Sequence, residues 1–407
     1  MPYRTDTPQD HESNGQRLAA LRKRRRWTQS KLAQESGYSL AAVKHFEQGR
    51  RSLDRGSVIL TFARALDAHP TEITGQPFTP GDRAAQDATA SVAAVRRALL
   101  RHGRPARPDD AEAAAVDLAE LRVRVAEANR LRQGAALART AELLPPLLRD
   151  LQVAVEVCDG PARRAVYDLL ASGYECAMQY LYKLGHSSDA TLATERVVWA
   201  ADLTEDPLRR TAARWYEAGE YLAIGEHHDA ADIIDQALID IGTPREPEAL
   251  SLAGAFHLKA ALNAARGGDD TAARKHLGRA QERADELGED RNDYQLQFGP
   301  TNAAIWSVSL PVEMGRGRDA VRAAEQVTAD LPEDYAPERR SHHFIDVGRG
   351  HWYNGQREQA LHAFLTAEAI APSATRMNAG VRETVRTMIR TQRQGTLVEL
   401  GMRVGAL

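Results

Sequence analysis

Apolar residues recur at intervals of three and four positions along most of the 407-residue chain. This spacing places them on one face of an α-helix, whereas a strand would need strict alternation. Near the N-terminus the pattern divides into four short segments, at residues 15–26, 31–36, 40–49 and 57–67. From residue 111 onward it is helical throughout. The pattern therefore predicts an all-α protein.

Capping residues and glycines mark the ends of the short N-terminal helices. Thr28 and Ser39 are predicted N-cap residues, because their side-chain oxygens can accept hydrogen bonds from the first turn of a helix. Gly37 and Gly49 are predicted to end the second and third helices. Two short helices around a glycine turn form a corner that can press its second helix into the major groove of DNA, about 12 Å wide. The sequence thus predicts a helix-turn-helix domain.

Glycine and proline concentrate at residues 75–83 (GQPFTPGDR), and a second break, HGRPARPDD, follows at 102–110. Such clusters punctuate secondary structure, and residues 84–100 between them fit one connecting helix. We therefore predict a helix-turn-helix domain over residues 1–78, a linker with a connecting helix over 79–110 and a helical repeat domain over 111–407.

Six glycines recur in the long helical region, each followed by a segment rich in alanine: Gly134, Gly185, Gly225, Gly267, Gly315 and Gly355. Their successive spacings are 51, 40, 42, 48 and 40 residues, which is the length of a tetratricopeptide helix pair or a little more. Helix pairs cannot bury their apolar faces alone, so they stack into a superhelix whose concave wall is lined by the first helix of each pair. The repeat predicts an α-solenoid of tetratricopeptide-like helix pairs.

Charge is unevenly distributed along the chain. The net charge is −3, but residues 1–78 contain 13 Lys and Arg against 8 Asp and Glu, which leaves +5 there and −8 in the remainder. A small basic domain on a larger acidic one suits a protein whose N-terminal part binds phosphates while the rest is repelled by them. This asymmetry indicates double-stranded DNA as a partner.

Other features argue against membrane insertion, bound metal and catalysis. No apolar run reaches the roughly 18 residues of a membrane helix, and the start, MPYRTDTPQDHESNG, lacks a secretion signal, so we expect a cytoplasmic protein. Cys158 and Cys176 lack the spacing of a zinc or redox motif. The pairs His227-His228 and His342-His343 have no flanking ligand set, so we expect no metal and no cofactor. Without a phosphate loop, a nucleophile elbow or HExxH, we expect no enzyme.

The run LRKRRRWTQSKLAQESGYSLAAVKHFEQGRRSL resembles the Cro/repressor-type (XRE family) helix-turn-helix regulators. It shares their T-Q opening, L-A-x-x-x-G turn and E-x-G-R ending. The whole chain is similar to actinobacterial members with a tetratricopeptide-like C-terminal domain, in LLPPLLRDL, FGPTN, APERRSHHFIDVGRG and NAGVRETVRTMIR. Its architecture is also similar to that of the peptide-pheromone receptors of Gram-positive bacteria. These resemblances imply a DNA-binding regulator that responds to a peptide or small molecule.

The resemblance also assigns residues to DNA. The helix after the turn reads bases in this family, and its outward positions, beside the inward Val43 and Phe46, are Ser39, Leu40, Ala41 and Lys44. Leu40 and Ala41 are apolar, so contacts to thymine methyl groups or readout of DNA shape would matter more here. The predicted phosphate contacts are Gln29, Arg50, Arg51 and, from the cationic run Arg22 to Arg26, Arg24.

The predicted groove has its own candidates. Asn129, Asn263 and Asn302 each lie on the first helix of a pair, and an amide there can both donate to and accept from a peptide backbone. Apolar pockets could come from Trp215, Tyr180, Trp306 and Tyr353. The alternative for these residues is structural, because aromatic side chains at helical spacing are usually core and asparagines often cap helices.

Two functions fit this sequence. The first is a sequence-specific transcriptional regulator that binds an inverted repeat as a homodimer and whose repeat domain senses a ligand. The second is a DNA-binding scaffold whose groove docks another protein.

Overall fold

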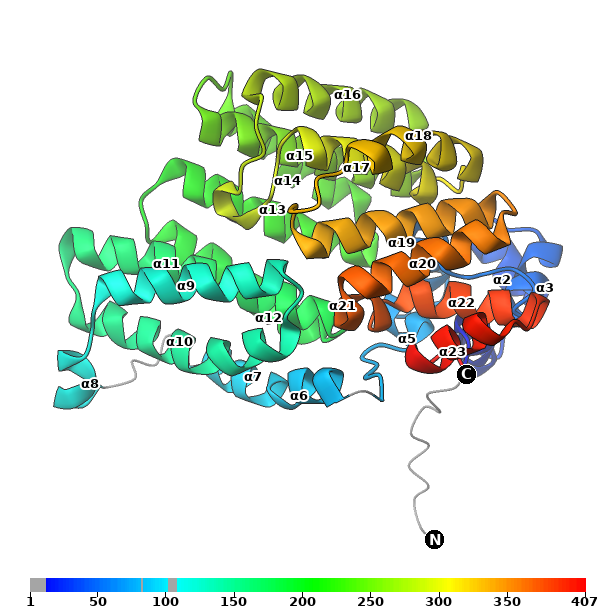
Figure 1. Ribbon diagram of the computed structural model, residues 1–407, viewed down its shortest axis with the longest axis horizontal. Coiled ribbons are helices and arrows are strands. Elements are labelled where there is room, and N and C mark those ends of the chain that lie inside the picture. The colour runs from blue at the N-terminus through cyan, green and yellow to red at the C-terminus, as the bar shows by residue number, and fades with distance from the viewer. Residues whose placement is uncertain (1–11, 82, 102–107) are drawn as a thin grey trace, which may run out of the picture.

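The computed structural model describes residues 12–81, 83–101 and 108–407, and Figure 1 shows these as an arrangement of helices. Within these ranges the only strand-like pairing is an isolated antiparallel bridge between Arg291 and Phe298. None of the described helices combines the length and the apolar character needed to cross a membrane. The prediction of an all-α fold, with a helix-turn-helix domain followed by a solenoid of helix pairs, is confirmed.

The N-terminal unit, here called the head, contains five helices: α1 (Asn14–Arg24), α2 (Gln29–Ser36), α3 (Leu40–Glu47), α4 (Gly56–Ala65) and α5 (Pro70–Thr74). The predicted caps are present. Thr28 accepts a hydrogen bond from the backbone N–H of Lys31, and Ser39 accepts one from that of Ala42, both at 3.1 Å. Gly37 ends α2 with a φ of 71°, a left-handed conformation that favours glycine.

The head has its own hydrophobic core. Val43 and Phe46 of α3 are almost fully buried, as their spacing predicts, together with Leu18 of α1 and Leu32 of α2. The ring of Phe46 packs edge-on against that of Phe62 of α4, with their centroids 5.6 Å apart. This apolar contact fixes the angle at which α3 leaves the corner.

The segment predicted as a connecting helix forms two helices, α6 (Arg83–Ala90) and α7 (Val92–Leu100), which meet at Ser91. Their apolar residues, among them Ala88 and Val95, belong to one buried cluster with α9 to α13, so they form a packed layer of the repeat domain. Of the second predicted break, residues 102–107 lie outside the described residues, as does the start of the chain at 1–11; the short α8 (Asp110–Ala114) follows.

Six antiparallel helix pairs, here called the body, make up most of the remaining chain. Their first helices are α9 (Leu118–Gln133), α11 (Gly160–Lys183), α13 (Pro207–Ile224), α15 (Pro247–Gly267), α17 (Pro300–Glu313) and α19 (Pro337–Tyr353). Their second helices are α10 (Leu137–Val157), α12 (Ser187–Asp202), α14 (His227–Ile241), α16 (Asp270–Leu287), α18 (Gly317–Asp330) and α20 (Arg357–Ile370). A short 3-10 turn, η1 (Asp293–Gln295), precedes α17, and the chain finishes with α21 (Pro372–Arg376), α22 (Ala379–Thr391) and α23 (Gly395–Arg403).

The predicted glycines lie at the turns within the pairs. Gly185, Gly225, Gly315 and Gly355 all have positive φ, as expected where a helix is ended sharply. In the fourth pair the residue with positive φ is Gly268, at 85°, while the expected Gly267 is the last residue of α15. In the first pair it is Ala135, at 57°, which follows Gly134 with a φ of −76°.

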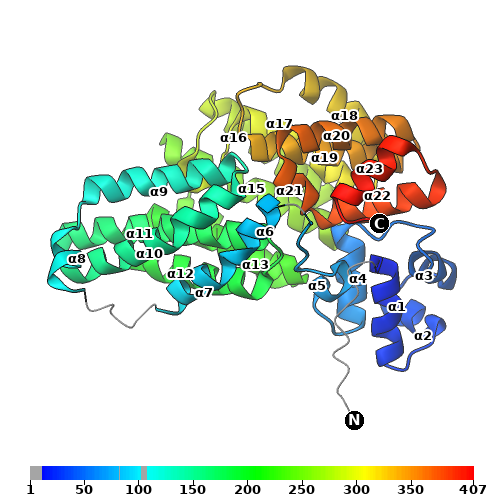
Figure 2. The ribbon, with the colours of Figure 1, turned by 60° about the horizontal axis from the view of Figure 1, so that its bottom comes forward.

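The superhelix of the body returns to its own beginning. Glu338 of α19 accepts a hydrogen bond from Arg132 of α9 at 3.0 Å and pairs with Lys183 of α11 at 2.7 Å. Met377, just after α21, joins the hydrophobic cluster of the first two pairs. Figures 1 and 2 both show the end of α9 beside α21 and α19. Contacts between the first and sixth pairs therefore close the body into one turn.

The head lies beneath α22 and α23 in Figure 2 and also contacts the turns of the body at Gly225 and Met314. Residues Val381 to Ile389 of α22 are all buried. This helix lies between the head and the body, so both units cover it.

Candidate nucleic-acid interface

The outward face of α3 is accessible. The four predicted base contacts, Ser39, Leu40, Ala41 and Lys44, are all exposed, whereas the intervening Val43 is fully buried. Ser39 is also the N-cap residue of α3, so it lies at the N-terminal end of this helix. A helix exposed along this side can enter a major groove with these side chains directed at base edges.

The head carries exposed cations after α3 and at the end of α1. Arg50 and Arg51 follow α3 directly, and the guanidinium of Arg51 lies 4.9 Å from the centre of the Phe46 ring. Arg24, at the end of α1, is exposed and pairs with Glu72 of α5 at 2.7 Å. A phosphate can replace Glu72 as its partner at little cost, because exposed ion pairs contribute only about 0.2–1 kcal/mol. The predicted phosphate contacts Arg24, Arg50 and Arg51 are therefore available.

Gln29 and Arg22 are held inside the head by Glu47, the glutamate of the E-x-G-R ending. Arg22 donates to both carboxylate oxygens of Glu47, at 2.6 and 2.9 Å, and to the backbone oxygen of Trp27 at 2.7 Å. Its hydrogen bond to Glu47 raises the pKa of Arg22, while burial lowers it. The half-buried Gln29 also donates to Glu47, at 2.7 Å. Within the cationic run Arg22 to Arg26, the guanidinium of Arg22 is therefore committed to Glu47, whereas Arg24 is exposed.

Asp54, between α3 and α4, anchors the opposite side of the head. Its side chain is 1% exposed and accepts hydrogen bonds from the hydroxyls of Tyr353 at 2.6 Å and Thr384 at 3.0 Å. Arg349 of α19 lies 3.5 Å from the same carboxylate and donates to the backbone oxygen of Asp54 at 3.2 Å. One carboxylate of the head is thus held by two helices of the C-terminal region, which the sequence did not predict.

Charged residues of α22 complete this docking. Glu383 accepts from the backbone N–H of Asn14 at 3.1 Å, and burial raises the pKa of Glu383. Arg382 donates to the backbone oxygen of Thr74 at 2.6 Å, and its guanidinium carbon lies 4.0 Å from the centre of the Phe78 ring. A Cβ at Gly49 would lie 1.6 Å from the guanidinium of Arg390, so the head approaches α22 closely here. All these contacts leave the outward face of α3 free.

The seven predicted groove residues are spread over all six first helices of the body. Asn129 is buried on α9 and donates to the backbone oxygen of Ser172 at 3.4 Å. Asn302 of α17 accepts from Arg339 and donates to the backbone oxygen of Gln297 at 2.7 Å. The amide of Asn302 is thus used on both sides within the fold, whereas the buried Oδ1 of Asn129 has no hydrogen-bond partner among the described residues.

The aromatic groove candidates also have partners within the protein. The indole N–H of Trp215 donates to the backbone oxygen of Ala255 at 3.1 Å, and the Lys259 ammonium lies 3.4 Å from its ring centre. Tyr180 donates to the backbone oxygen of Ala88, and Tyr353 binds Asp54. Asn263 differs from the other candidates, because it lines a cavity between α14, α15 and α16.

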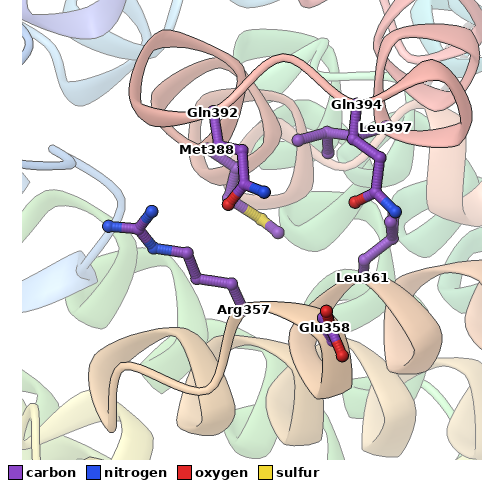
Figure 3. Close-up of a pocket in the computed structure, with 7 residues that line it drawn as sticks. All are labelled: Arg357, Glu358, Leu361, Met388, Gln392, Gln394 and Leu397. Carbon is purple, nitrogen blue, oxygen red and sulfur yellow. The ribbon is translucent and has the colours of Figure 1, made fainter.

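A second hollow, drawn in Figure 3, lies between α20, α22 and α23. Met388 and Leu397 line it from above and Arg357 and Glu358 from below in that view. Its volume of about 20 Å³ suits a single water molecule, which needs at least about 10–15 Å³. This hollow does not hold a ligand-sized molecule.

Fold and interface together define an all-α protein with an N-terminal helix-turn-helix domain and a body of repeated helix pairs. Residues 15–74 match the family described as "Helix-turn-helix domain". No curated protein matches the chain. Among solved structures, the chain is similar to BtubC (BKLC) from P. vanneervenii, with 17% sequence identity and a TM-score of 0.37, over 62% of this chain and 91% of that one. The tetratricopeptide character of the body stays a prediction.

Proposed function

We propose that the protein is a sequence-specific DNA-binding transcriptional regulator. The observation that carries this proposal is the exposed outward face of α3, on a head that carries exposed arginines and whose opposite side is docked. Lys44 would donate to base edges in the major groove, while Arg50, Arg51 and Arg24 would bind phosphates and fix the register. Gln29, at the N-terminus of α2, would contribute a phosphate contact only by releasing Glu47.

We further propose that the body senses a peptide or small-molecule signal and that the protein acts as a cytoplasmic homodimer on an inverted repeat, without a cofactor or enzymatic activity. Two half-sites must lie about one helical turn, roughly 34 Å, apart for both heads to bind. Because α22 and Asp54 tie the head to the tetratricopeptide-like body, a change in the body would move the heads relative to each other. Such a movement would change affinity for the operator.

Lys44→Ala and Arg50→Ala test the proposed roles. Duplexes bound by the purified protein are first selected from genomic DNA, and the affinity of each variant is then measured for the selected and for unrelated duplexes. Lys44→Ala should cost about 1–3 kcal/mol on the selected duplex and relax sequence preference. Arg50→Ala should weaken binding to all duplexes by a similar factor and lower the salt dependence.

Arg274→Ala, which removes an exposed charge from α16 of the body, is the matched control and should leave DNA binding unchanged. An equal loss of preference from Lys44→Ala and Arg50→Ala would contradict the division into base and phosphate contacts. Absence of salt-sensitive binding to any duplex would contradict the proposed function itself.

A further inference from the structure

A cavity of about 230 Å³ lies between α14, α15 and α16. Its polar lining comes from His227, Asp235, Asn263, Asp269 and His276, and the rest is apolar, mainly alanines. The volume exceeds the roughly 150 Å³ of an engineered cavity that binds benzene, but lies below the 300–1,000 Å³ typical of drug-sized ligands. The space therefore suits a small molecule rather than a peptide.

The hydrogen bonds of Asn263 define what His227 presents to this cavity. The amide N–H of Asn263 donates to the backbone oxygen of His227 at 2.8 Å, so the amide oxygen is the atom 2.8 Å from Nδ1 of the His227 ring. An amide oxygen only accepts, which places a proton on Nδ1. In the neutral ring Nε2 is then an acceptor, and no hydrogen bond among the described residues uses it.

Carboxylates supply negative charge at the same place. Asp235 is exposed on α14 and has no ion-pair partner among the described residues. Asp269 is the N-cap of α16, and its Oδ1 accepts from the backbone N–H groups of Thr271 and Ala272. These donors at the N-terminus of α16 are therefore already used and do not offer a binding site for an anion.

His276 and its neighbour His257 both have lowered pKa values, which favours their neutral forms. Nδ1 of His276 lies 3.2 Å from Nδ1 of His257 on α15, a distance at which one neutral ring donates to the other. Burial lowers the pKa of His276, which Asp235 raises and Lys275 lowers. Burial likewise lowers the pKa of His257, to about 4, with a further contribution from His276. The cavity thus combines hydrogen-bond acceptors, negative charge and an apolar wall.

We propose that this cavity binds a small organic ammonium ion, whose N–H groups donate to Nε2 of His227 and to Asp235 while its apolar part packs against Ile234 and the alanines. An acceptor-lined site with unpaired negative charge favours a donor that is a cation. No other described group at the cavity neutralises Asp235, so the ligand would supply its counter-ion.

That this ammonium ligand is the signal sensed by the body rests on the proposed function; binding in the cavity does not. The backbone oxygen of Gly225 accepts a hydrogen bond from Arg64 of α4, and a Cβ on Gly225 would lie 3.4 Å from Leu60 of the same helix. His227 follows two residues later, at the start of α14. A ligand held by His227 therefore acts on the turn against which the head packs.

Calorimetric titration of the full chain at pH 7.5 tests the site with three probes of similar size. These are 2-phenylethylammonium, the uncharged 2-phenylethanol and the anionic phenylacetate. The ammonium should bind at least tenfold more tightly than the alcohol, and phenylacetate should bind more weakly still. Asp235→Asn should reduce ammonium affinity at least tenfold. Asp232→Asn, an exposed carboxylate of α14 paired with His228 outside the cavity lining, is the control and should bind as the unchanged protein does.

Equal binding of ammonium and alcohol, preference for phenylacetate, no effect of Asp235→Asn, or no ammonium binding up to 10 mM would each overturn the proposal. Asp235 is exposed, so its substitution should leave the thermal melting curve unchanged, and a melting curve recorded on the same sample checks this. Titration does not involve DNA, so its outcome is independent of the test of Lys44. Binding that depends on Asp235 but leaves DNA affinity unchanged would support the site and contradict its role as the sensor.

Discussion

The head and the body differ in what their interiors contain. The head is built around aliphatic and aromatic side chains such as Leu18, Phe46 and Phe62, with Arg22 and Glu47 as a partly buried ion pair. The body buries many charged side chains where its helices meet, among them Arg132 and Glu338. Apolar packing over short sequence separations gives the head one rigid shape, whereas buried charges stabilise only when every partner is in place. The comparison teaches that the outward face of α3 rests on an apolar core, whereas the packing of the body depends on buried ion pairs.

One buried ion pair of the body shows the opposing effects of burial and of a charged partner on a carboxyl group. Glu175 of α11 is fully buried and lies 2.9 Å from Arg209 of α13, which is 2% exposed. Burial raises the pKa of Glu175 to about 7, although Arg209 lowers it. A carboxyl in the interior of the body is thus held between the opposing effects of burial and of its arginine partner.

Glu338→Ala should lower the stability of the body more than any other variant proposed here. Removing the carboxylate leaves Arg132 and Lys183 buried without a counter-ion, which typically costs about 3–5 kcal/mol. The free energy of unfolding, measured by urea denaturation, should fall by that amount. Glu333→Ala, at an exposed position in the preceding loop, should change it little. A loss below about 1 kcal/mol for Glu338→Ala would show that closure of the body does not depend on these ion pairs.

Asp54→Ala should loosen the head from the body at a smaller cost. The variant removes the acceptor of the Tyr353 hydroxyl, which should cost about 1–3 kcal/mol, whereas Thr384 keeps the backbone oxygen of Gly380 and Arg349 keeps Asp346 and the backbone oxygen of Asp54. Hydrogen exchange should speed up in α1 and α22 and stay unchanged in α10. Asp67→Asn, which removes the charge of the exposed pair with Arg25 and keeps a residue type that tolerates the positive φ at this position, is the control. Faster exchange across the whole body would mean that Asp54 stabilises more than the docking.

Lys259→Met should remove a pH dependence that belongs to the body. Burial lowers the pKa of Lys259 to about 7 from 10.5. Between these values the unfolded chain holds the proton and the folded chain does not, so the stability of the unchanged protein rises with pH, by at most about 1.4 kcal/mol per pH unit. Melting temperatures at pH 7.5 and 9.5 should therefore differ less in the variant. If the melting temperatures of both proteins change equally between pH 7.5 and 9.5, Lys259 stays protonated in the folded protein over this range.

Arg24→Ala should have the smallest effect on stability, below about 1 kcal/mol, because its pair with Glu72 is exposed. Its effect should appear in DNA binding instead, as weaker affinity for every duplex and a smaller salt dependence. Glu72→Gln breaks the same pair but keeps the arginine, so it should retain or strengthen DNA binding. Weaker binding in both variants would show that the pair itself positions the head.

Local signals made the head predictable from its sequence. Thr28, Gly37 and Ser39 act on neighbouring residues, and the helical period of Val43 and Phe46 separates the buried side of α3 from the side that carries Lys44. Four of the six turn glycines of the body, Gly185, Gly225, Gly315 and Gly355, were predictable for the same reason. Which outward residues of α3 touch bases stays a prediction.

Contacts between distant residues were not predictable in this way. Asp54 has the sequence context of an ordinary turn residue, yet its partners Arg349 and Thr384 are 295 and 330 positions away. The charged residues Arg382 and Glu383 have the pattern of a solvated helix face, and they are buried only because two units cover α22. The periodicity of a helix shows which of its faces is polar. It does not show whether a distant part of the chain packs against that face.

The closed turn of the body limits how this architecture can vary. An open array of helix pairs can gain or lose a unit at modest cost, since each unit contacts only its neighbours. Here Glu338 must contact Arg132, 206 positions away in the chain. One additional helix pair would displace α19 from α9 and leave both buried charges without their partners. The count of units is thereby locked, and melting should proceed as one event rather than unit by unit.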